Sequence, residues 1–278
     1  MASESLTKAA IPSEMLPLHP SEPNKGNSQR IANVKGRFAV VIPVYNHGRT
    51  VKAVATAASA SGWPVYVVDD GSTDGGDPSL ESMANLCLLR HRVNRGKGAA
   101  LMTGFRAAAE RADWAITLDA DGQHFPEDAH ELIDAIPQGR RPIMLGCRLQ
   151  MSAEGAPWTS RFGRGFSNFW IRMAGGPQVT DSQSGFRIYP LPEVLQLGVR
   201  AQRYQFEIEV LVKAAWSAME VIEAPIGVSY PPKAERVSHF RPFVDFWRNT
   251  TTFARLITRR VVLGRPRARK NAAPGASR

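Results

Sequence analysis

The sequence predicts an α/β protein with an open, mostly parallel sheet flanked by helices. Strand-like apolar runs alternate with helical segments between residues 37 and 146, and short polar loops join them. Such alternation is typical of parallel strands connected by crossover helices. The first run, residues 37–45, is a continuous β-branched stretch, which indicates a strand buried on both faces.

The other elements follow from the same patterns. Further strands are expected at 63–68, 86–90, 114–118 and 142–146, and helices at 50–60 and 99–112. Residues 125–128 contain a proline followed by two acids, which indicates a helix start. Residues 221–228 are expected to form an edge strand. Residues 243–261 carry an apolar stripe at helical spacing with arginines beside it, which predicts a C-terminal amphipathic helix.

Domain boundaries follow changes in composition. Residues 1–35 are polar and lack periodicity, so we expect a disordered tail. Residues 36–232 form the α/β domain, residues 233–263 a loop and the amphipathic helix, and residues 264–278 a basic disordered tail.

The net charge of +10 favours an acidic partner, which could be nucleic acid, an anionic membrane surface or a phosphorylated substrate. No apolar run approaches the roughly 18–20 residues that cross a bilayer, and the first residues lack the apolar segment of a secretory signal. Cys87 and Cys147 have no metal-type spacing. We therefore expect reduced thiols and a cytoplasmic protein, with Cys87 in the core.

Four polar clusters lie where predicted strands end: residues 45–46, 69–70, 94–97 and 119–123. Ligands of open α/β sheets bind beyond the carboxyl ends of the strands. We therefore expect one site at this edge of the sheet. The alternative is that these residues only form turns and helix caps.

The cluster after residues 114–118 predicts a metal site. Asp119 and Asp121 are two residues apart at a strand end, so their side chains point to the same side. Two carboxylates this close repel each other unless a cation lies between them. With the amide oxygen of Gln123 they offer ligands that Mg²⁺ or Mn²⁺ prefers, and they leave room for substrate phosphates. The alternative is a solvated loop.

Three motifs together resemble the inverting family 2 glycosyltransferases of GT-A fold: residues 41–46, 67–74 and 118–123. The form Asp-x-Asp-x-Gln-His, the segment 180–187 and the segment 205–211 are similar to the branch that contains dolichyl- and polyprenyl-phosphate sugar synthases. The resemblance extends over about residues 37–232. It implies a GT-A fold and sugar transfer from a nucleotide donor.

The resemblance also implies roles for individual positions. The residues expected to bind the nucleotide sugar are Pro43, Tyr45, Asp70 and Asp119. Lys97, from the third polar cluster, is expected to bind it as well. Those assigned to the metal are Asp119, Asp121 and Gln123. Those assigned to the acceptor phosphate are Arg148, Arg161, Arg164, Ser167 and Arg236. The catalytic set is Asp121, Asp181, Glu207 and Arg187.

The chemistry of the acceptor determines whether the site needs a general base. An attacking lipid phosphate is already anionic and needs no strong base, whereas a hydroxyl acceptor would need one, for which Asp181 and Glu207 are candidates. Glu207 and Glu209 lie about 200° apart on a helix, so only one can face the site, and the other faces solvent or an ion pair. Arg187 is expected in a Gly-Phe-Arg turn, as a further phosphate contact.

The favoured function is metal-dependent inverting transfer of a sugar from a UDP- or GDP-linked donor to a membrane-associated lipid, with a polyprenyl phosphate as first choice. The branch closes its site with a loop of the type Arg-x-x-Gly-x-Ser-Lys. This chain has Arg236 and Ser238 but not the glycine or the lysine. Another lipid or an aromatic hydroxyl therefore stays an alternative acceptor.

The basic C-terminal third favours peripheral binding to the inner face of the cell membrane through the amphipathic helix. The alternative is a helix packed on the protein's own sheet. A nucleic-acid-binding protein is a weaker alternative, since stacking aromatics do not alternate with the basic residues, and we expect no nucleic-acid partner.

Overall fold

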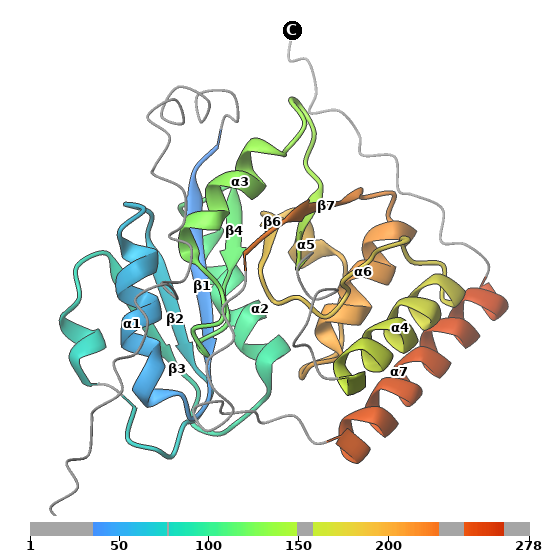
Figure 1. Ribbon diagram of the computed structural model, residues 1–278, viewed down its shortest axis with the longest axis horizontal. Helices are drawn as coiled ribbons and strands as arrows, with labels where there is room; N and C mark the ends of the chain where they lie inside the picture. Colours follow the sequence, from blue (N-terminus) through green and yellow to red (C-terminus); the bar gives the residue numbers. More distant parts are fainter. Residues whose placement is uncertain (1–35, 77, 149–157, 228–241, 264–278) are drawn as a thin grey trace, which may run out of the picture.

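The computed structural model describes residues 36–76, 78–148, 158–227 and 242–263, and within them one sheet has helices on both faces (Figure 1). The strands are β1 (Phe38–Val44), β2 (Val65–Asp69), β3 (Leu86–Arg90), β4 (Trp114–Thr117), β5 (Ile143–Cys147), β6 (Arg187–Pro190) and β7 (Val221–Pro225). The longer helices are α1 (Gly48–Ser59), α2 (Lys97–Ala108), α4 (Trp158–Met173), α6 (Phe206–Trp216) and α7 (Pro242–Leu263). Shorter ones are α3 (Ala129–Asp134), α5 (Glu193–Gln196) and the 3₁₀ turns η3 (Pro78–Ser82) and η4 (Pro126–Asp128).

The sheet order is β3-β2-β1-β4-β6-β5-β7. The five strands predicted up to residue 146 and the edge strand β7 are confirmed, and so is the mostly parallel α/β class. The structure adds β6, which pairs antiparallel with both β4 and β5. The expectation of a turn at Arg187 is therefore wrong. This strand has only four residues and begins with an arginine, so its composition does not mark it as a strand.

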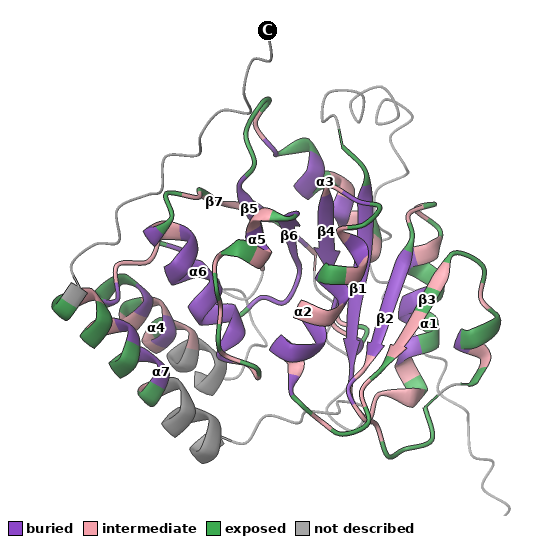
Figure 2. Ribbon diagram, turned by 180° about the vertical axis from the view of Figure 1, so that it is seen from behind, coloured by how far each residue is buried: buried purple, intermediate pink, exposed green. Residues whose placement is uncertain are grey.

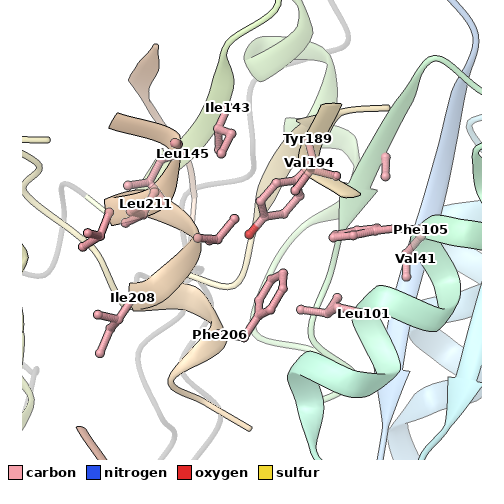
Figure 3. Packing of buried hydrophobic residues seen from close by; sticks show 14 of the residues in the cluster. Val41, Leu101, Phe105, Ile143, Leu145, Tyr189, Val194, Phe206, Ile208 and Leu211 are labelled. Carbon is pink, nitrogen blue, oxygen red and sulfur yellow. The ribbon is translucent and has the colours of Figure 1, made fainter. Parts of the chain in front are cut away.

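Two apolar cores lie on the two faces of the sheet, because successive side chains of each strand alternate. Val40 and Ile42 of β1 face α1 and α3, whereas Ala39 and Val41 face α2 and α6. In the second core, Phe206 of α6 packs against Phe105 of α2 and Tyr189 of β6, with ring centroids 6.3 and 6.4 Å apart (Figure 3). The strand ends are therefore held by packing on both sides.

Helix α7 confirms the predicted amphipathic helix. It packs on α4 and contacts α6, and the side chains it buries include Phe253 and Leu256, both 2% exposed. Figure 2 shows its outer face exposed and α6 almost wholly buried. Phe253 of α7 contacts Trp170 of α4, and Arg255 contacts Glu209 of α6. Among the described helices, none combines the length and apolar character needed to cross a membrane.

One core assignment is wrong. Cys87 is exposed, whereas Cys147 is buried. The apolar run around Cys87 forms β3, and β3 is an edge strand that is covered less than the central strands. The predicted tails at 1–35 and 264–278, and the loop with Arg236, lie outside the described residues.

Two helical glycines allow a test of the packing between α2 and β1. A Cβ on Gly104 would lie 2.4 Å from Cγ1 of Val41, whereas one on Gly165 of α4 would meet open space. We expect Gly104→Ala to lower the free energy of unfolding by about 1–3 kcal/mol through overpacking. Gly165→Ala should raise it by up to about 1 kcal/mol through helix propensity. Urea unfolding measures both, and equal effects would contradict this packing.

Candidate active site

The loops that follow β1 and β2 are bonded to each other at the carboxyl edge of the sheet. The side-chain oxygen of Asn46 accepts a hydrogen bond from the backbone N–H of Thr73 at 2.7 Å, and Ser72 Oγ accepts one from the N–H of Asn46 at 3.0 Å. Asn46 has a φ of 55°, a left-handed conformation that asparagine tolerates better than most residues. The first two predicted clusters therefore meet.

Asp70 joins the third cluster to them. It is 2% exposed, and its carboxylate accepts hydrogen bonds from the N–H groups of Gly96 at 2.6 Å and Arg95 at 3.0 Å. His91 Nδ1 lies 2.6 Å from the same carboxylate. Gly96 has a φ of 104°, and a Cβ there would collide with Arg203. Asp70 therefore fixes the loop that begins α2, and its predicted contact with the nucleoside stays a prediction.

Lys97 extends from that loop to the fourth cluster. Its Nζ lies 2.6 Å from Oδ1 of Asp119 and 2.5 Å from Oε1 of Glu207. Burial would lower the pKa of Lys97, but the two carboxylates outweigh it and raise the pKa well above its ordinary value. The side chain is therefore a permanent cation, and the predicted residues Lys97, Asp119 and Glu207 form one cluster.

The arrangement of Asp119 and Asp121 fits a divalent cation. Burial alone would raise the pKa of Asp119, but Lys97 lowers it below its ordinary value. Burial and the charge of Asp119 raise the pKa of Asp121, and the N–H of Gln123 donates to its Oδ1 at 3.0 Å. Within the described residues, no group of three or more His, Cys, Asp or Glu side chains could hold a metal. A carboxylate pair completed by an amide oxygen, water and phosphate suits Mg²⁺ or Mn²⁺.

Asp181 is fully buried and bonded to Arg148. Nε of Arg148 lies 2.6 Å from Oδ2, and Nη2 lies 2.8 Å from Oδ1. Burial would raise the pKa of Asp181, but this two-point contact and the charge of Arg164 lower it. Both carboxylate oxygens are engaged and the pKa is low, so the structure disfavours Asp181 as a general base.

Arg187 is also buried, and its predicted contact with phosphate is wrong. Its guanidinium donates to the carbonyl oxygens of Ser184 at 2.7 Å, Ser182 at 2.8 Å and Glu207 at 3.0 Å, and it is 0% exposed. A buried cation needs such acceptors. Arg187 therefore ties the segment that carries Asp181 to the first turn of α6.

The remaining predicted residues lie around this site. Pro43 is buried in β1, beyond the last residue of β1 that pairs with β4, where a missing N–H is tolerated. Tyr45 is half-buried at the end of β1. Ser167 is buried and accepts a hydrogen bond from Gln183, which does not suggest contact with a phosphate. Arg164 lies near Asp181, and Arg161 lies on α4, where only the backbone is described.

Sequence reasoning missed several residues that shape the site. Glu223 of β7 accepts hydrogen bonds from the N–H groups of Thr180 at 2.8 Å and Asp181 at 3.1 Å, which positions that segment. His91 and Arg203 support the loop before α2. Only the fold brings them to their partners, so no local pattern could have identified them.

His124, which precedes η4, is buried near the carboxylate pair. Its ring is 8% exposed and packs on Phe186 with centroids 5.5 Å apart. Burial lowers the pKa of His124 to about 4. The imidazole is therefore neutral at pH 7 beside the carboxylate pair.

The sheet is mostly parallel, and the Asp-x-Asp turn after its central strand β4 lies within electrostatic reach of Arg148. The chain belongs to glycosyl transferase family 2, whose model matches residues 39–190.

Curated relatives and solved structures agree with this family. The chain is 32% identical over 213 residues to the UDP-N-acetylglucosamine–dolichyl-phosphate N-acetylglucosaminyltransferase of Methanococcus voltae, which covers 69% of this chain and 85% of that protein. It is 28% identical over 222 residues to the polyprenol monophosphomannose synthase of Mycolicibacterium smegmatis, with coverages of 74% and 83%. The fold resembles that of glucosyl-3-phosphoglycerate synthase from Mycobacterium tuberculosis in complex with Mn²⁺, UDP-glucose and phosphoglyceric acid. That match has a TM-score of 0.64, 18% identity, and covers 86% of this chain and 85% of that one.

The bond between Arg148 and Asp181 predicts a large effect on stability. Arg148→Met leaves a buried carboxylate without its cation and should lower the free energy of unfolding by about 3–5 kcal/mol at pH 7. The matched control is Arg37→Met, because the pair of Arg37 with Asp113 is exposed on both sides. That control should change stability by less than about 1 kcal/mol.

The effect should depend on pH. The pKa of Asp181 is lowered in the folded protein, so its contribution is complete above its ordinary pKa of about 4 and is lost as the pH falls through the lowered value. The difference between wild type and Arg148→Met should therefore narrow in acid. Adding Asp181→Asn to Arg148→Met should recover part of the loss. Urea unfolding between pH 3 and 8 measures this, and a pH-independent difference would refute the assignment.

Proposed function

We propose that this chain transfers a sugar, with inversion, from a nucleotide-sugar donor to the phosphate of a membrane-associated polyprenyl phosphate. The observation that carries the proposal is that one site combines two functions. Asp119 and Asp121 form an acidic pair for a metal, and Arg148 is a cation that would attract an anionic acceptor. The charge of Arg148 acts on both Asp119 and Asp121, so the two halves of the site lie within electrostatic reach.

The donor half is suited to a leaving diphosphate. Asp119, Asp121 and Gln123 would hold Mg²⁺ or Mn²⁺, which, when bound, would neutralise charge on the departing oxygens. Lys97 supplies a second positive charge. Its amine stays protonated because two carboxylates raise its pKa. Pro43, Tyr45 and Asp70 line the neighbouring edge, where the nucleoside would bind.

The acceptor half is suited to an anion that needs no deprotonation. An acceptor phosphate oxygen forms a bond to the anomeric carbon as the bond to the nucleoside diphosphate breaks, and no proton has to move. Arg148, whose Nε and Nη2 bond Asp181, and Arg164 near it would attract the anionic phosphate by their positive charge. Both relatives described above carry dolichyl phosphate or polyprenol in their names, which supports this acceptor.

An alcohol acceptor, either another lipid or an aromatic hydroxyl, is the second candidate. It would require a general base within reach of the hydroxyl. Asp181 is bonded to Arg148 and Glu207 to Lys97, so each candidate base is already paired with a cation. This pairing favours the phosphate acceptor.

We further propose that α4 and α7 bring the protein to the inner, cytoplasmic face of the cell membrane as a peripheral protein. The two helices lie side by side (Figure 1) and contain seven arginines and one aspartate between them. Their exposed apolar side chains include Phe169, Met173, Val261 and Val262. Basic helices with exposed apolar residues bind anionic lipid surfaces.

Donor binding tests the first proposal. UDP-, GDP- and dTDP-sugars are added to the wild type and to Asp121→Ala, with and without Mn²⁺ or Mg²⁺, and thermal unfolding is followed. At 100 times the dissociation constant, the right donor should add about 2.7 kcal/mol, a shift of a few degrees. The shift should require metal and vanish in Asp121→Ala but persist in Asp134→Ala, whose side chain is exposed on α3. Absence of any shift would sink the proposal.

Transfer is then assayed with the identified donor. A radiolabelled sugar should move to a polyprenyl phosphate and not to the matching polyprenol, which lacks the phosphate. Equal transfer to the polyprenol would favour the alcohol acceptor instead.

Vesicle sedimentation tests the membrane proposal. The protein should bind vesicles with 30% anionic lipid, less strongly at high salt. Arg172→Gln should weaken binding about fivefold, since one surface arginine contributes about 1 kcal/mol. Val261→Asp should also weaken it, whereas Val93→Asp, which replaces an exposed valine away from these helices, should not. Binding that is unaffected by salt, by Arg172→Gln and by Val261→Asp would contradict a docking role for α4 and α7.

A further inference from the structure

Lys97 occupies a position between the candidate metal site and helix α6. Its ammonium contacts Oδ1 of Asp119 and Oε1 of Glu207, at 2.6 and 2.5 Å, and its side chain is 15% exposed. The other oxygen of Asp119, Oδ2, faces Gly185, where an added Cβ would lie 2.3 Å from it. Both sides of the Asp119 carboxylate are therefore occupied, one by a cation and one by backbone.

The backbone that carries Lys97 is fixed from two directions. Asp70 accepts hydrogen bonds from the N–H groups of Arg95 and Gly96, and the carbonyl of Gln202 accepts one from Ala99 at 2.9 Å. The Cα of Lys97 cannot shift without breaking these bonds. Any change in the partner of its ammonium must therefore come from rotation of its own flexible side chain.

The charges of this cluster make metal and nucleotide interdependent. Asp119, Asp121 and Glu207 contribute three negative charges and Lys97 one positive charge. A dication that approaches Asp119 meets the ammonium, which repels it and competes for the same carboxylate. An incoming diphosphate offers the ammonium new anionic partners and leaves Oδ1 of Asp119 to the metal.

We infer that Lys97 is a positioning residue that makes binding of the divalent metal depend on the nucleotide diphosphate. This inference rests on the proposed function, because it assumes that a nucleotide diphosphate binds beside Asp119. In the free protein Lys97 balances Asp119 and keeps metal affinity low. With the nucleotide present, Lys97 contacts the diphosphate, and metal and nucleotide bind cooperatively. Glu207 keeps the ammonium within reach of both.

Mn²⁺ binding tests this directly, without measuring turnover. Free Mn²⁺ is followed by electron paramagnetic resonance during titration of the protein alone, with UDP and with GDP. For the wild type, one nucleotide should tighten Mn²⁺ binding at least tenfold. In Lys97→Met, Mn²⁺ alone should bind more tightly than to the wild type, and the gain from the nucleotide should fall below threefold.

Three further variants separate this role from a general loss of structure. Lys97→Arg should keep part of the nucleotide effect, because it retains the charge. Glu207→Gln removes a negative charge and should weaken Mn²⁺ binding without nucleotide. Lys52→Met, which removes an exposed lysine on α1, should match the wild type. Circular dichroism melts report whether each variant is folded.

The outcomes distinguish the inference from the proposed function. If Lys97→Met shows the wild-type Mn²⁺ affinity and the wild-type gain with nucleotide, the inference is overturned while the donor site stands. If the folded wild type binds no Mn²⁺ with either nucleotide, the proposed function fails as well. Tighter binding of Mn²⁺ alone with a lost nucleotide effect supports the inference.

Discussion

Buried carboxylates determine how the working edge of this protein is assembled, because each must find a cation or several N–H donors once it leaves water. Asp70, Asp181 and Glu209 are all nearly inaccessible to solvent. Their partners come from remote segments: the loop before α2 for Asp70, Arg148 for Asp181, and Arg255 of α7 for Glu209. Loss of one partner weakens the compensation of a buried charge, and the effect is largest for Asp181, whose side-chain cation is Arg148.

The apolar cores and the polar carboxyl edge of the sheet therefore stabilise different parts of the structure. The two cores on the faces of the sheet fix where β1, β2 and β4 end. The loops beyond those ends contain few apolar side chains and are held by hydrogen bonds and ion pairs. Antiparallel β6 adds to this edge, because it brings the segment before Arg187 beside β4, so that Gly185 meets Asp119.

Much of the framework follows from local sequence patterns. Residues 37–45 are rich in β-branched residues and contain β1 (Phe38–Val44). Asp119 and Asp121 are two residues apart in the turn after β4, close enough for the charge of Asp119 to raise the pKa of Asp121. Glu207 and Glu209 diverge as helix geometry requires, with Glu207 at the site and Glu209 in an ion pair.

What sequence could not show is the choice of partner. The sequence alone suggests that Asp181 is an unpaired carboxylate. In the fold it is bonded to Arg148, which is 33 residues away in the chain. From the sequence, Arg187 looks like an arginine that binds phosphate, yet its side chain is buried in the protein. Burial and pairing decide these roles, and both depend on contacts between distant segments. The short strand β6, with an arginine at its start, escaped prediction for the same reason.

The contact between Arg255 and Glu209 has a consequence for how the enzyme can evolve. The carboxylate of Glu209 lies 2.7 Å from the guanidinium of Arg255 and also accepts the N–H of Ala201 at 2.8 Å. Helix α7 is thus bonded to a buried residue of α6 and is part of the folded domain. Exchange of this helix would leave Glu209 with Lys213 of its own helix as a partner but without the cation on its other oxygen, so residues 209 and 255 are expected to change together.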